Sequence, residues 1–356
     1  MKVIQLIPTI TYGDAVSNHC IAIDRLLRSM GFKTGIYADG IGASLPAGTA
    51  QSVRDLPQLT KEDVVIYHGA IGSELNYLLP KLPCRKIMIY HNITPPEFFH
   101  GFCAVSEQLC RDGLEQMRFL ADKLDYCIAD SEFNKQDLLR MGFTCPIDVC
   151  PLLIAFSDYE KAPSEEVIRR YRDGHTNLLF VGRLAPNKKQ ENVIRAFYFY
   201  HKFLNPKSRL FLAGSGEGAY PDALRNYVAA LGLQDSVIFP GHIKFNELLA
   251  YYHVADAFVC MSEHEGFCVP LVEAMYFDIP IIALSTSAIP WTLGGSGVLL
   301  ESNTSIPAAE TIYSLTTDKA RREAVLQSQR ARLRDFDPAL VAEELKALLT
   351  AFLAKS

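Results

Sequence analysis

Short apolar runs alternate with amphipathic helical patterns along most of this chain. Within the runs, apolar and polar residues rarely alternate, which favours parallel strands that are covered on both faces. These runs predict strands at residues 3–7, 35–37, 64–67, 87–90, 126–129, 147–150, 178–181, 210–213, 237–239, 257–260 and 280–283. Because helical patterns fill the gaps, the fold class is α/β, with two doubly wound parallel sheets.

A polar, proline-bearing stretch at residues 157–164 separates the two halves of this pattern. We therefore predict an N-terminal domain over 1–156, a linker over 157–174 and a C-terminal domain over 175–335. A helical segment over 336–356 follows, and packing back on the N-terminal domain is one arrangement open to it. The length of 356 residues agrees with two domains.

Composition and charge narrow the function classes. The net charge of −5 argues against nucleic acid as the main partner. The nine cysteines are scattered without a Cys-x-x-Cys pair, which is typical of core thiols in a reducing cytosol. The N-terminus predicts a strand rather than a signal peptide, and no apolar run is long enough to span a membrane. We expect a soluble cytoplasmic protein, with peripheral contact at a membrane left open.

The stretch 262–275 carries the strongest chemical signal. Glu265 and Glu273 lie eight residues apart across a predicted strand-to-helix junction, and Pro270 fits the first helical position. Carboxylates there can accept hydrogen bonds from hydroxyl groups, and free N–H groups at a helix start favour anionic oxygens. The N–H groups expected to point outward are those of Gly266, Phe267 and Cys268.

Two further loops follow predicted strands of the C-terminal half. Gly182 ends one strand and precedes Arg183 and Lys188, which suit a pyrophosphate group. The alternative is a solvated loop with two ordinary cations. The turn that begins at Gly214 resembles a phosphate loop but does not match G-x-G-x-x-G, so a tight turn close to a ligand is favoured.

The N-terminal half offers three candidates. Gly13 allows close approach of a ligand to a helix start. Asp14 is equally compatible with a sugar hydroxyl and with helix capping, while Ser17 is predicted to cap the first helix. His91 follows a strand and either holds a substrate group or bonds a neighbouring carbonyl.

Two other patterns have simpler explanations. The chain's one Asp-x-Asp, at Asp335 and Asp337, precedes Pro338 and is better explained by helix capping than by metal binding. The histidines lack ligand spacing, so no metal is expected. Six cations between Lys319 and Arg334 favour a solvated helix face over a phosphate- or membrane-facing surface.

Taken in order, these segments resemble the glycosyltransferases of family 4. The resemblance rests on Gly182-Arg183-Leu184 with Lys188, Gly214-Ser215-Gly216, Pro240-Gly241-His242, the 262–274 stretch and Pro280-Ile281-Ile282-Ala283. It is strongest over residues 177–301. It implies retaining, nucleotide-sugar-dependent enzymes with the GT-B fold, in which two Rossmann-like domains face a central cleft.

The resemblance also implies roles for individual residues. Arg183 and Lys188 would bind the donor diphosphate, and Glu273 would accept hydrogen bonds from the ribose. Glu265, with the N–H groups of Gly266 and Phe267, would hold the transferred sugar. The remaining family positions are His242 and Ile243 beside the base, His91 near the sugar and Gly13 near the phosphates.

Two positions depart from the family pattern. Asp14 stands where the family usually has a second glycine, and Pro151-Leu152-Leu153-Ile154 replaces a Pro-Asn-Gly turn. The first departure puts phosphate contact by the Gly13 loop in doubt. The second weakens any inference about the hinge.

The expected activity is therefore transfer of a hexose-type sugar from a UDP- or GDP-sugar to a glycan or lipid-linked glycan, as in bacterial surface polysaccharide biosynthesis. No cofactor is expected beyond the nucleotide-sugar co-substrate. A non-catalytic nucleotide-sugar-binding subunit and a GT-B epimerase or phosphorylase remain alternatives. A dinucleotide oxidoreductase lacks its G-x-G-x-x-G motif here. The base, sugar, acceptor and oligomeric state are left open.

Overall fold

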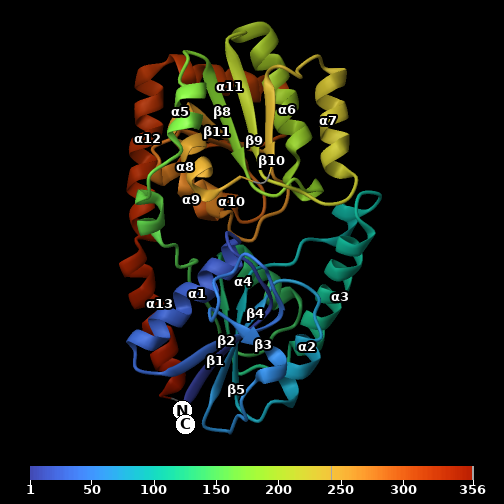
Figure 1. Ribbon diagram of the computed structural model, residues 1–356, viewed down its shortest axis with the longest axis vertical. Helices are drawn as coiled ribbons and strands as arrows, with labels where there is room; N and C mark the ends of the chain where they lie inside the picture. Colours follow the sequence, from blue (N-terminus) through green and yellow to red (C-terminus); the bar gives the residue numbers. More distant parts are fainter. Residues whose placement is uncertain (242, 355–356) are drawn as a thin grey trace. The chain divides into compact units, whose positions relative to one another are not determined.

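The computed structural model describes residues 1–241 and 243–354, and the chain divides into two compact units. Unit 1 comprises Met1–Pro96, Val105–Phe156 and Phe336–Ser356, and unit 2 comprises Glu97–Ala104 and Ser157–Asp335. Each unit is built on its own parallel sheet (Figure 1). The prediction of two doubly wound α/β domains is confirmed.

The described part of unit 1 holds a seven-stranded sheet in the order β3-β2-β1-β4-β5-β6-β7. Its strands are β1 (Lys2–Ile10), β2 (Lys33–Ile41), β3 (Gln51–Ser52), β4 (Val64–Gly69), β5 (Arg85–Tyr90), β6 (Tyr126–Ala129) and β7 (Ile147–Val149). Strand order reverses direction between β1 and β4. In open parallel sheets, ligands bind beyond the carboxyl ends of the strands at such a reversal.

Helices cover the sheet of unit 1, among them α1 (Ala15–Ser29), α2 (Leu75–Leu78), α3 (Ala104–Leu120), α4 (Glu132–Arg140) and α13 (Pro338–Leu353). The last of these comes from the opposite end of the chain (Figure 1). Val341, Leu345 and Leu349 of α13 are buried in one apolar cluster with Val3 of β1 and Ile23 of α1. The segment after residue 335 thus belongs to the core of unit 1.

The described part of unit 2 holds a six-stranded sheet in the order β10-β9-β8-β11-β12-β13. The strands are β8 (Thr176–Val181), β9 (Ser208–Ala213), β10 (Val237–Gly241), β11 (Ala257–Cys260), β12 (Ile281–Leu284) and β13 (Val298–Leu300). The helices are α5 (Glu165–Tyr171), α6 (Gln190–Phe199), α7 (Tyr220–Ala230), α8 (Phe245–Val254), α9 (Val269–Tyr276), α10 (Ile289–Leu293), α11 (Ser305–Thr317) and α12 (Lys319–Leu333). Here strand order reverses between β8 and β11.

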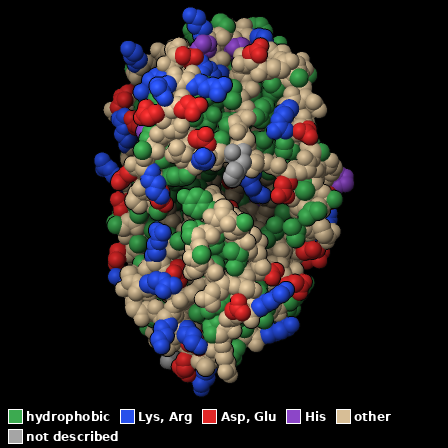
Figure 2. Space-filling view, viewed as in Figure 1, with side chains coloured by type: hydrophobic (Ala, Val, Ile, Leu, Met, Phe, Trp, Pro, Cys, Tyr) green, Lys and Arg blue, Asp and Glu red, His purple; other side chains and the backbone are tan. Residues whose placement is uncertain are grey.

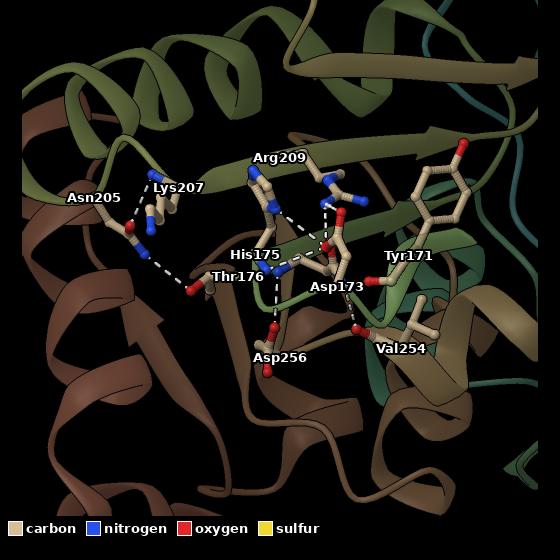
Figure 3. A network of polar contacts seen from close by, with 10 residues as sticks. Tyr171, Asp173, His175, Thr176, Asn205, Lys207, Arg209, Val254 and Asp256 are labelled. Atoms are coloured by element: carbon tan, nitrogen blue, oxygen red, sulfur yellow. Dashed lines mark hydrogen bonds and ion pairs between the residues drawn. The ribbon is translucent and has the colours of Figure 1, made fainter. Parts of the chain in front are cut away.

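A polar network fixes the amino end of β8 (Figure 3). Arg209 of β9 donates to both carboxylate oxygens of Asp173, at 2.5 and 2.6 Å, and lies over the ring of Tyr171. The backbone N–H of Asn177 donates to Asp256 at 2.8 Å. Desolvation raises the pKa of Asp173, but hydrogen bonds from Arg209 and His175 outweigh it and bring the pKa to about 2.

Several predicted boundaries shift in the structure. The strands β3 and β13 were not predicted, because the first is a polar pair at a sheet edge and the second is only three residues long. Helix α6 ends at Phe199, and the chain continues as a π-helical turn over Tyr200–Leu204. The predicted capping by Asp337 is confirmed, since its side chain accepts from two backbone N–H groups at the start of α13.

Several cations of α12 bond to other residues of the protein. Arg330 pairs with Asp278 and Glu323, and Arg332 donates to backbone carbonyl oxygens and to Asp335. On the face shown in Figure 2, Lys and Arg are interspersed with Asp and Glu. The pairing of Arg330 and Arg332 with carboxylates supports a solvated helix face rather than a dedicated surface for anions.

Candidate functional site

Two loops meet where the strand order of unit 2 reverses. One follows β8 over residues 182–189 and the other follows β11 over residues 261–268. Because β8 and β11 are neighbouring parallel strands, their carboxyl ends open onto the same edge of the sheet. The sequence-predicted residues Arg183, Lys188 and Glu265 all lie on these two loops.

Lys188 and Glu265 form a direct ion pair across the two loops. The ammonium of Lys188 lies 2.5 Å from the Glu265 carboxylate, and the two side chains are 18% and 7% exposed. Breaking a pair at this depth leaves a partly desolvated charge, so the two residues hold each other in place. The pair presents a cation and a carboxylate side by side.

Asn187, which the sequence analysis did not single out, joins the same loops. Its side-chain N–H donates to the backbone carbonyl oxygen of His264 at 3.0 Å. The backbone carbonyl oxygen of Asn187 accepts from the N–H of Glu263 at 2.9 Å. Asn187 is 2% exposed. These two hydrogen bonds fix the spacing of the loops on either side of the ion pair.

Arg183 and Lys189 supply further positive charge at this edge. Arg183 is exposed, and its guanidinium has no hydrogen-bond or ion-pair partner among residues 1–241 and 243–354. Lys189 has a left-handed backbone with φ of 50° and lies 3.5 Å from Glu263. Arg183 is therefore available to an anion, whereas Lys189 is already engaged.

Glycines allow the loops after β8 and β9 to touch backbone to backbone. A Cβ on Gly214 would lie 2.0 Å from the carbonyl oxygen of Gly182, and one on Gly216 would lie 2.1 Å from that of Leu184. The N–H of Leu184 donates to Ser215 at 2.8 Å. Any side chain at Gly214 or Gly216 would push the two loops apart.

Helix α9 begins beside Glu265. Cys268 precedes it in the left-handed conformation with φ of 72°, so the helix starts at Val269 and Pro270 takes the second rather than the first helical position. The backbone of Phe267 accepts from Thr292, and that of Glu265 donates to Ser287. Gly266, Phe267 and Cys268 thus form the tight connection between Glu265 and the helix.

Glu273 lies in α9, one turn beyond this connection, and both its oxygens accept from tyrosines. Tyr159 donates to one oxygen at 2.9 Å and Tyr252 to the other at 2.5 Å. Burial raises the pKa of Glu273, and the two tyrosine hydrogen bonds oppose that rise. Nothing in the sequence around Tyr159 or Tyr252 pointed to these contacts.

A pocket of about 290 Å³ opens next to the Gly214 loop. It is lined by Leu184, Gly214, Ser215, Gly216, Gly218, Pro221, Asp222, Arg225, Phe239 and Gly241. Arg225 lies over the ring of Phe239 and pairs with Asp222. Ile243, predicted beside a base, is partly buried, and His242 lies outside the described residues.

In unit 1 the three candidates take different places. Gly13 has φ of 83° and no atom within 4 Å of the position of a Cβ, as an open turn requires. Asp14 caps α1 by accepting from the N–H of Ser17 at 2.9 Å, which supports the capping alternative. Ser17 itself does not cap α1, because its hydroxyl accepts instead from the N–H of Thr11.

The side chain of His91 is buried, although the residue as a whole is partly exposed. Its side chain is 2% exposed, with Nδ1 2.6 Å from Asp130 and Nε2 2.9 Å from His68. Its two side-chain partners are thus a histidine and a carboxylate, and not the neighbouring carbonyl that was the other prediction. The role implied for His91 near a sugar stays a prediction.

Comparison with known proteins finds a family match within unit 2. Residues 165–332 match the family described as Glycosyl transferases group 1. This part of the chain is therefore similar to a glycosyl transferases group 1 domain. The domain contains both loops of the candidate site, with Arg183, Lys188, Glu265 and Glu273.

The first two curated relatives match more of the chain than residues 165–332 do. The chain is 24% identical over 283 residues to the O-antigen chain mannosyltransferase B of Escherichia coli, covering 76% of this chain and 70% of that protein. It is 27% identical over 252 residues to the D-inositol 3-phosphate glycosyltransferase of Kineococcus radiotolerans, covering 65% and 57%. The chain thus spans little more than half the length of the second relative.

Solved structures share the whole fold. HepE of Anabaena, solved in complex with UDP-glucose, matches with a TM-score of 0.78 at 18% identity, covering 99% of this chain and all of that chain. WaaG, a glycosyltransferase involved in lipopolysaccharide biosynthesis, matches with a TM-score of 0.75 at 14% identity, covering 98% and 99%. These matches establish the GT-B fold.

Membrane contact was left open by the sequence. Among the described residues, none of the helices combines the length and the apolar character needed to cross a bilayer.

Proposed function

We propose that this chain is a retaining glycosyltransferase that moves a hexose-type sugar from a UDP- or GDP-sugar to a glycan or lipid-linked glycan acceptor. The observation that carries the proposal is the Lys188–Glu265 pair, with the unengaged Arg183 beside it, at the strand reversal of the region similar to a glycosyl transferases group 1 domain. One relative is named as a GDP-mannose-dependent mannosyltransferase, and HepE was solved with UDP-glucose. We extend this to a role in surface polysaccharide biosynthesis at the inner face of the cytoplasmic membrane.

The proposed chemistry follows from where charge develops. Cleavage of the bond between the anomeric carbon and the donor oxygen leaves a nucleoside diphosphate and an oxocarbenium-like sugar. Arg183 and Lys188 compensate the charge on the diphosphate, which makes a divalent ion unnecessary for the leaving group. Glu265 accepts hydrogen bonds from the sugar hydroxyls, and Glu273 accepts them from the ribose.

Retention is proposed to arise without a covalent sugar–enzyme intermediate. Glu265 is held by Lys188 at 2.5 Å, which lowers its reactivity as a nucleophile. The acceptor oxygen then attacks the face from which the diphosphate leaves, and the departing phosphate oxygen takes the acceptor proton. A glycosyl adduct trapped on Glu265 would contradict this route.

A thermal-shift panel of UDP-, GDP- and ADP-sugars tests donor binding, since a ligand that binds the folded state raises Tm by mass action. We expect a shift with one base, lost in Lys188→Ala and kept in Lys207→Ala, a cation change at the other end of the sheet. No shift with any nucleotide sugar would contradict the proposal.

Product analysis of the bound donor separates a transferase from its alternatives. Slow release of free sugar without acceptor, and a new glycan with acceptor, support transfer. An epimerised nucleotide sugar, or phosphate-dependent cleavage of a glycan, would favour an epimerase or a phosphorylase instead. Binding without any turnover would favour a supporting subunit.

A further inference from the structure

Histidines that look scattered in the sequence converge at the carboxyl edge of the unit 1 sheet. His68 lies near the end of β4, His91 directly follows β5, and His19 lies in the first half of α1. Asp130 directly follows β6. His19, His68 and Asp130 are at most 3% exposed, so this polar cluster must be satisfied from within.

Gln5 of β1 and three of these groups, His68, His91 and Asp130, form a continuous series of hydrogen bonds. Oε1 of Gln5 lies 3.0 Å from Nε2 of His68, and Nδ1 of His68 lies 2.9 Å from Nε2 of His91. Nδ1 of His91 then lies 2.6 Å from Oδ2 of Asp130. The series runs from β1 to β6 across the reversal of strand order between β1 and β4.

The positions of the protons in this series of hydrogen bonds show which proton a metal ion can replace. Gln5 presents its side-chain oxygen to Nε2 of His68, so that nitrogen carries a proton, and in the neutral ring Nδ1 is then an acceptor. His68 therefore carries its proton on Nε2, and its Nδ1 accepts from His91. One more proton is shared between Nδ1 of His91 and Oδ2 of Asp130.

His19 is placed beside this shared proton without a partner of its own. Its ring centroid lies 5.6 Å from that of His91, with the planes at 82°. Within the described chain, neither ring nitrogen of His19 nor Oδ1 of Asp130 has a hydrogen-bond partner. Each such buried polar atom gives up its hydrogen bonds to water on folding without gaining a replacement.

We propose that His19, His91 and Asp130 form a binding site for a divalent transition-metal ion, with Zn²⁺ the best match. One ligand atom from each residue lies within 4.8 Å of the other two. Imidazole and carboxylate ligands suit Zn²⁺, and bonds of about 2.0–2.2 Å place ligand atoms about 3.3 Å apart in a tetrahedron. Side-chain adjustments of about an ångström therefore complete the site.

The surrounding hydrogen bonds fit a metal in place of the shared proton. With Nδ1 of His91 bound to the ion, its Nε2–H donates to His68, whose Nε2–H donates to Gln5. A ligating histidine commonly donates its other N–H in this manner, which fixes its tautomer. The ion also gives a partner to one of the two ring nitrogens of His19 and to a carboxylate oxygen of Asp130, and three protein ligands leave one position for water.

Zn²⁺ titration of the full-length, chelator-treated protein against a chromophoric chelator tests the site. We expect one ion per chain, at least tenfold weaker binding in His19→Gln and in Asp130→Asn, and about 10–100-fold weaker binding in His68→Gln. His201→Gln is the matched control, because that histidine of unit 2 bonds Ser208 and Ser236 and should leave affinity unchanged. Equal affinity in wild type and in the His19→Gln/Asp130→Asn double variant would overturn the proposal.

A second group of potential ligands, Cys260, Glu265 and Cys268 in unit 2, must be distinguished. Co²⁺ reports thiolate ligands by a charge-transfer band in the near ultraviolet. We expect a spectrum without that band and unchanged Zn²⁺ affinity in Cys268→Ala. A thiolate band together with lost affinity in Cys268→Ala would assign the ion to unit 2 instead. If circular dichroism shows that His19→Gln does not fold, the Zn²⁺ affinities of Asp130→Asn and His68→Gln test the proposal instead.

Discussion

The ammonium of Lys188 lies 2.5 Å from the carboxylate of Glu265, although 77 positions of sequence separate the two residues. Each side chain is the neutralising partner of the other while the site holds no anion. An incoming diphosphate would share the ammonium with Glu265. The pair therefore couples the position of a phosphate group to that of a carboxylate that can contact a sugar.

Replacing one member of this pair should harm both turnover and stability. Lys188→Ala is expected to lower kcat by about 10²-fold or more, as loss of a charge clamp does. It should also lower the free energy of unfolding by about 3 kcal/mol, because Glu265 stays buried without its partner. Steady-state kinetics and urea unfolding measure the two effects, with Lys207→Ala as the control. Lys188→Ala/Glu265→Gln should recover part of the lost stability; strictly additive losses would show that the pair is not coupled.

Contact between the loops after β8 and β9 should make Gly214 irreplaceable. In Gly214→Ala the new methyl would meet the Gly182 carbonyl oxygen at 2.0 Å, so the loops must separate. Gly232→Ala is the matched control, since its φ of 64° is also positive but no atom lies within 4 Å. We expect a loss of about 1–2 kcal/mol for Gly232→Ala and a larger loss, with weakened donor binding, for Gly214→Ala. Equal Tm values for the two variants would refute the loop contact.

Donor binding should depend on pH through Glu273. Only the ionised carboxylate can accept from both ribose hydroxyls, and burial raises the pKa of Glu273 above 4.5. Affinity for the nucleotide should therefore fall as the pH falls through this raised pKa. Tyr252→Phe removes a hydrogen bond to the charged form and should move the loss to higher pH. Isothermal titration calorimetry between pH 8 and pH 4.5 measures the nucleotide affinity of the wild type and of Tyr252→Phe.

The same shift has the opposite sign for stability. Because folding favours the neutral carboxyl of Glu273, the contribution of this residue to the free energy of unfolding is present below pH 4.5 and is lost as the pH rises through the folded pKa.

Tyr251→Phe is the control for the effect of Tyr252→Phe on nucleotide affinity, since Tyr251 lies on the same helix and interacts with Tyr171 instead. If the pH profile of nucleotide affinity is unchanged in Tyr252→Phe, protonation of Glu273 is not the cause of the loss of affinity at low pH.

Acid stability should depend on Asp173. Its folded pKa of about 2 is below the ordinary 3.8, so its contribution is present above pH 3.8 and is lost as the pH falls toward 2. Asp173→Asn should flatten the dependence of Tm on pH in that window, whereas Asp235→Asn, at an exposed loop position, should not. A wild-type slope that survives in Asp173→Asn would count against the Arg209 contact as its source.

The sequence was informative where local pattern decides structure. Apolar runs located most strands, and because strand ends in a parallel sheet share an edge, the positions of Arg183, Lys188 and Glu265 followed. It was not informative where side chains from distant elements meet. The contacts of Asn187 with His264 and of Tyr159 with Glu273 join residues 77 and 114 positions apart, and no local pattern encodes them. The prediction that Ser17 caps α1 was wrong for a different reason. Asp14 and Ser17 are both good capping residues, and only the path of the chain selects Asp14.

The position of α13 has a consequence for biosynthesis. Its apolar side chains complete the core around Val3 and Ile23, so unit 1 cannot close until α13 has left the ribosome. Unit 2, whose main segment ends at Asp335, has all of its own chain available earlier. The N-terminal half of this protein is thus expected to finish folding last, the reverse of the usual vectorial order.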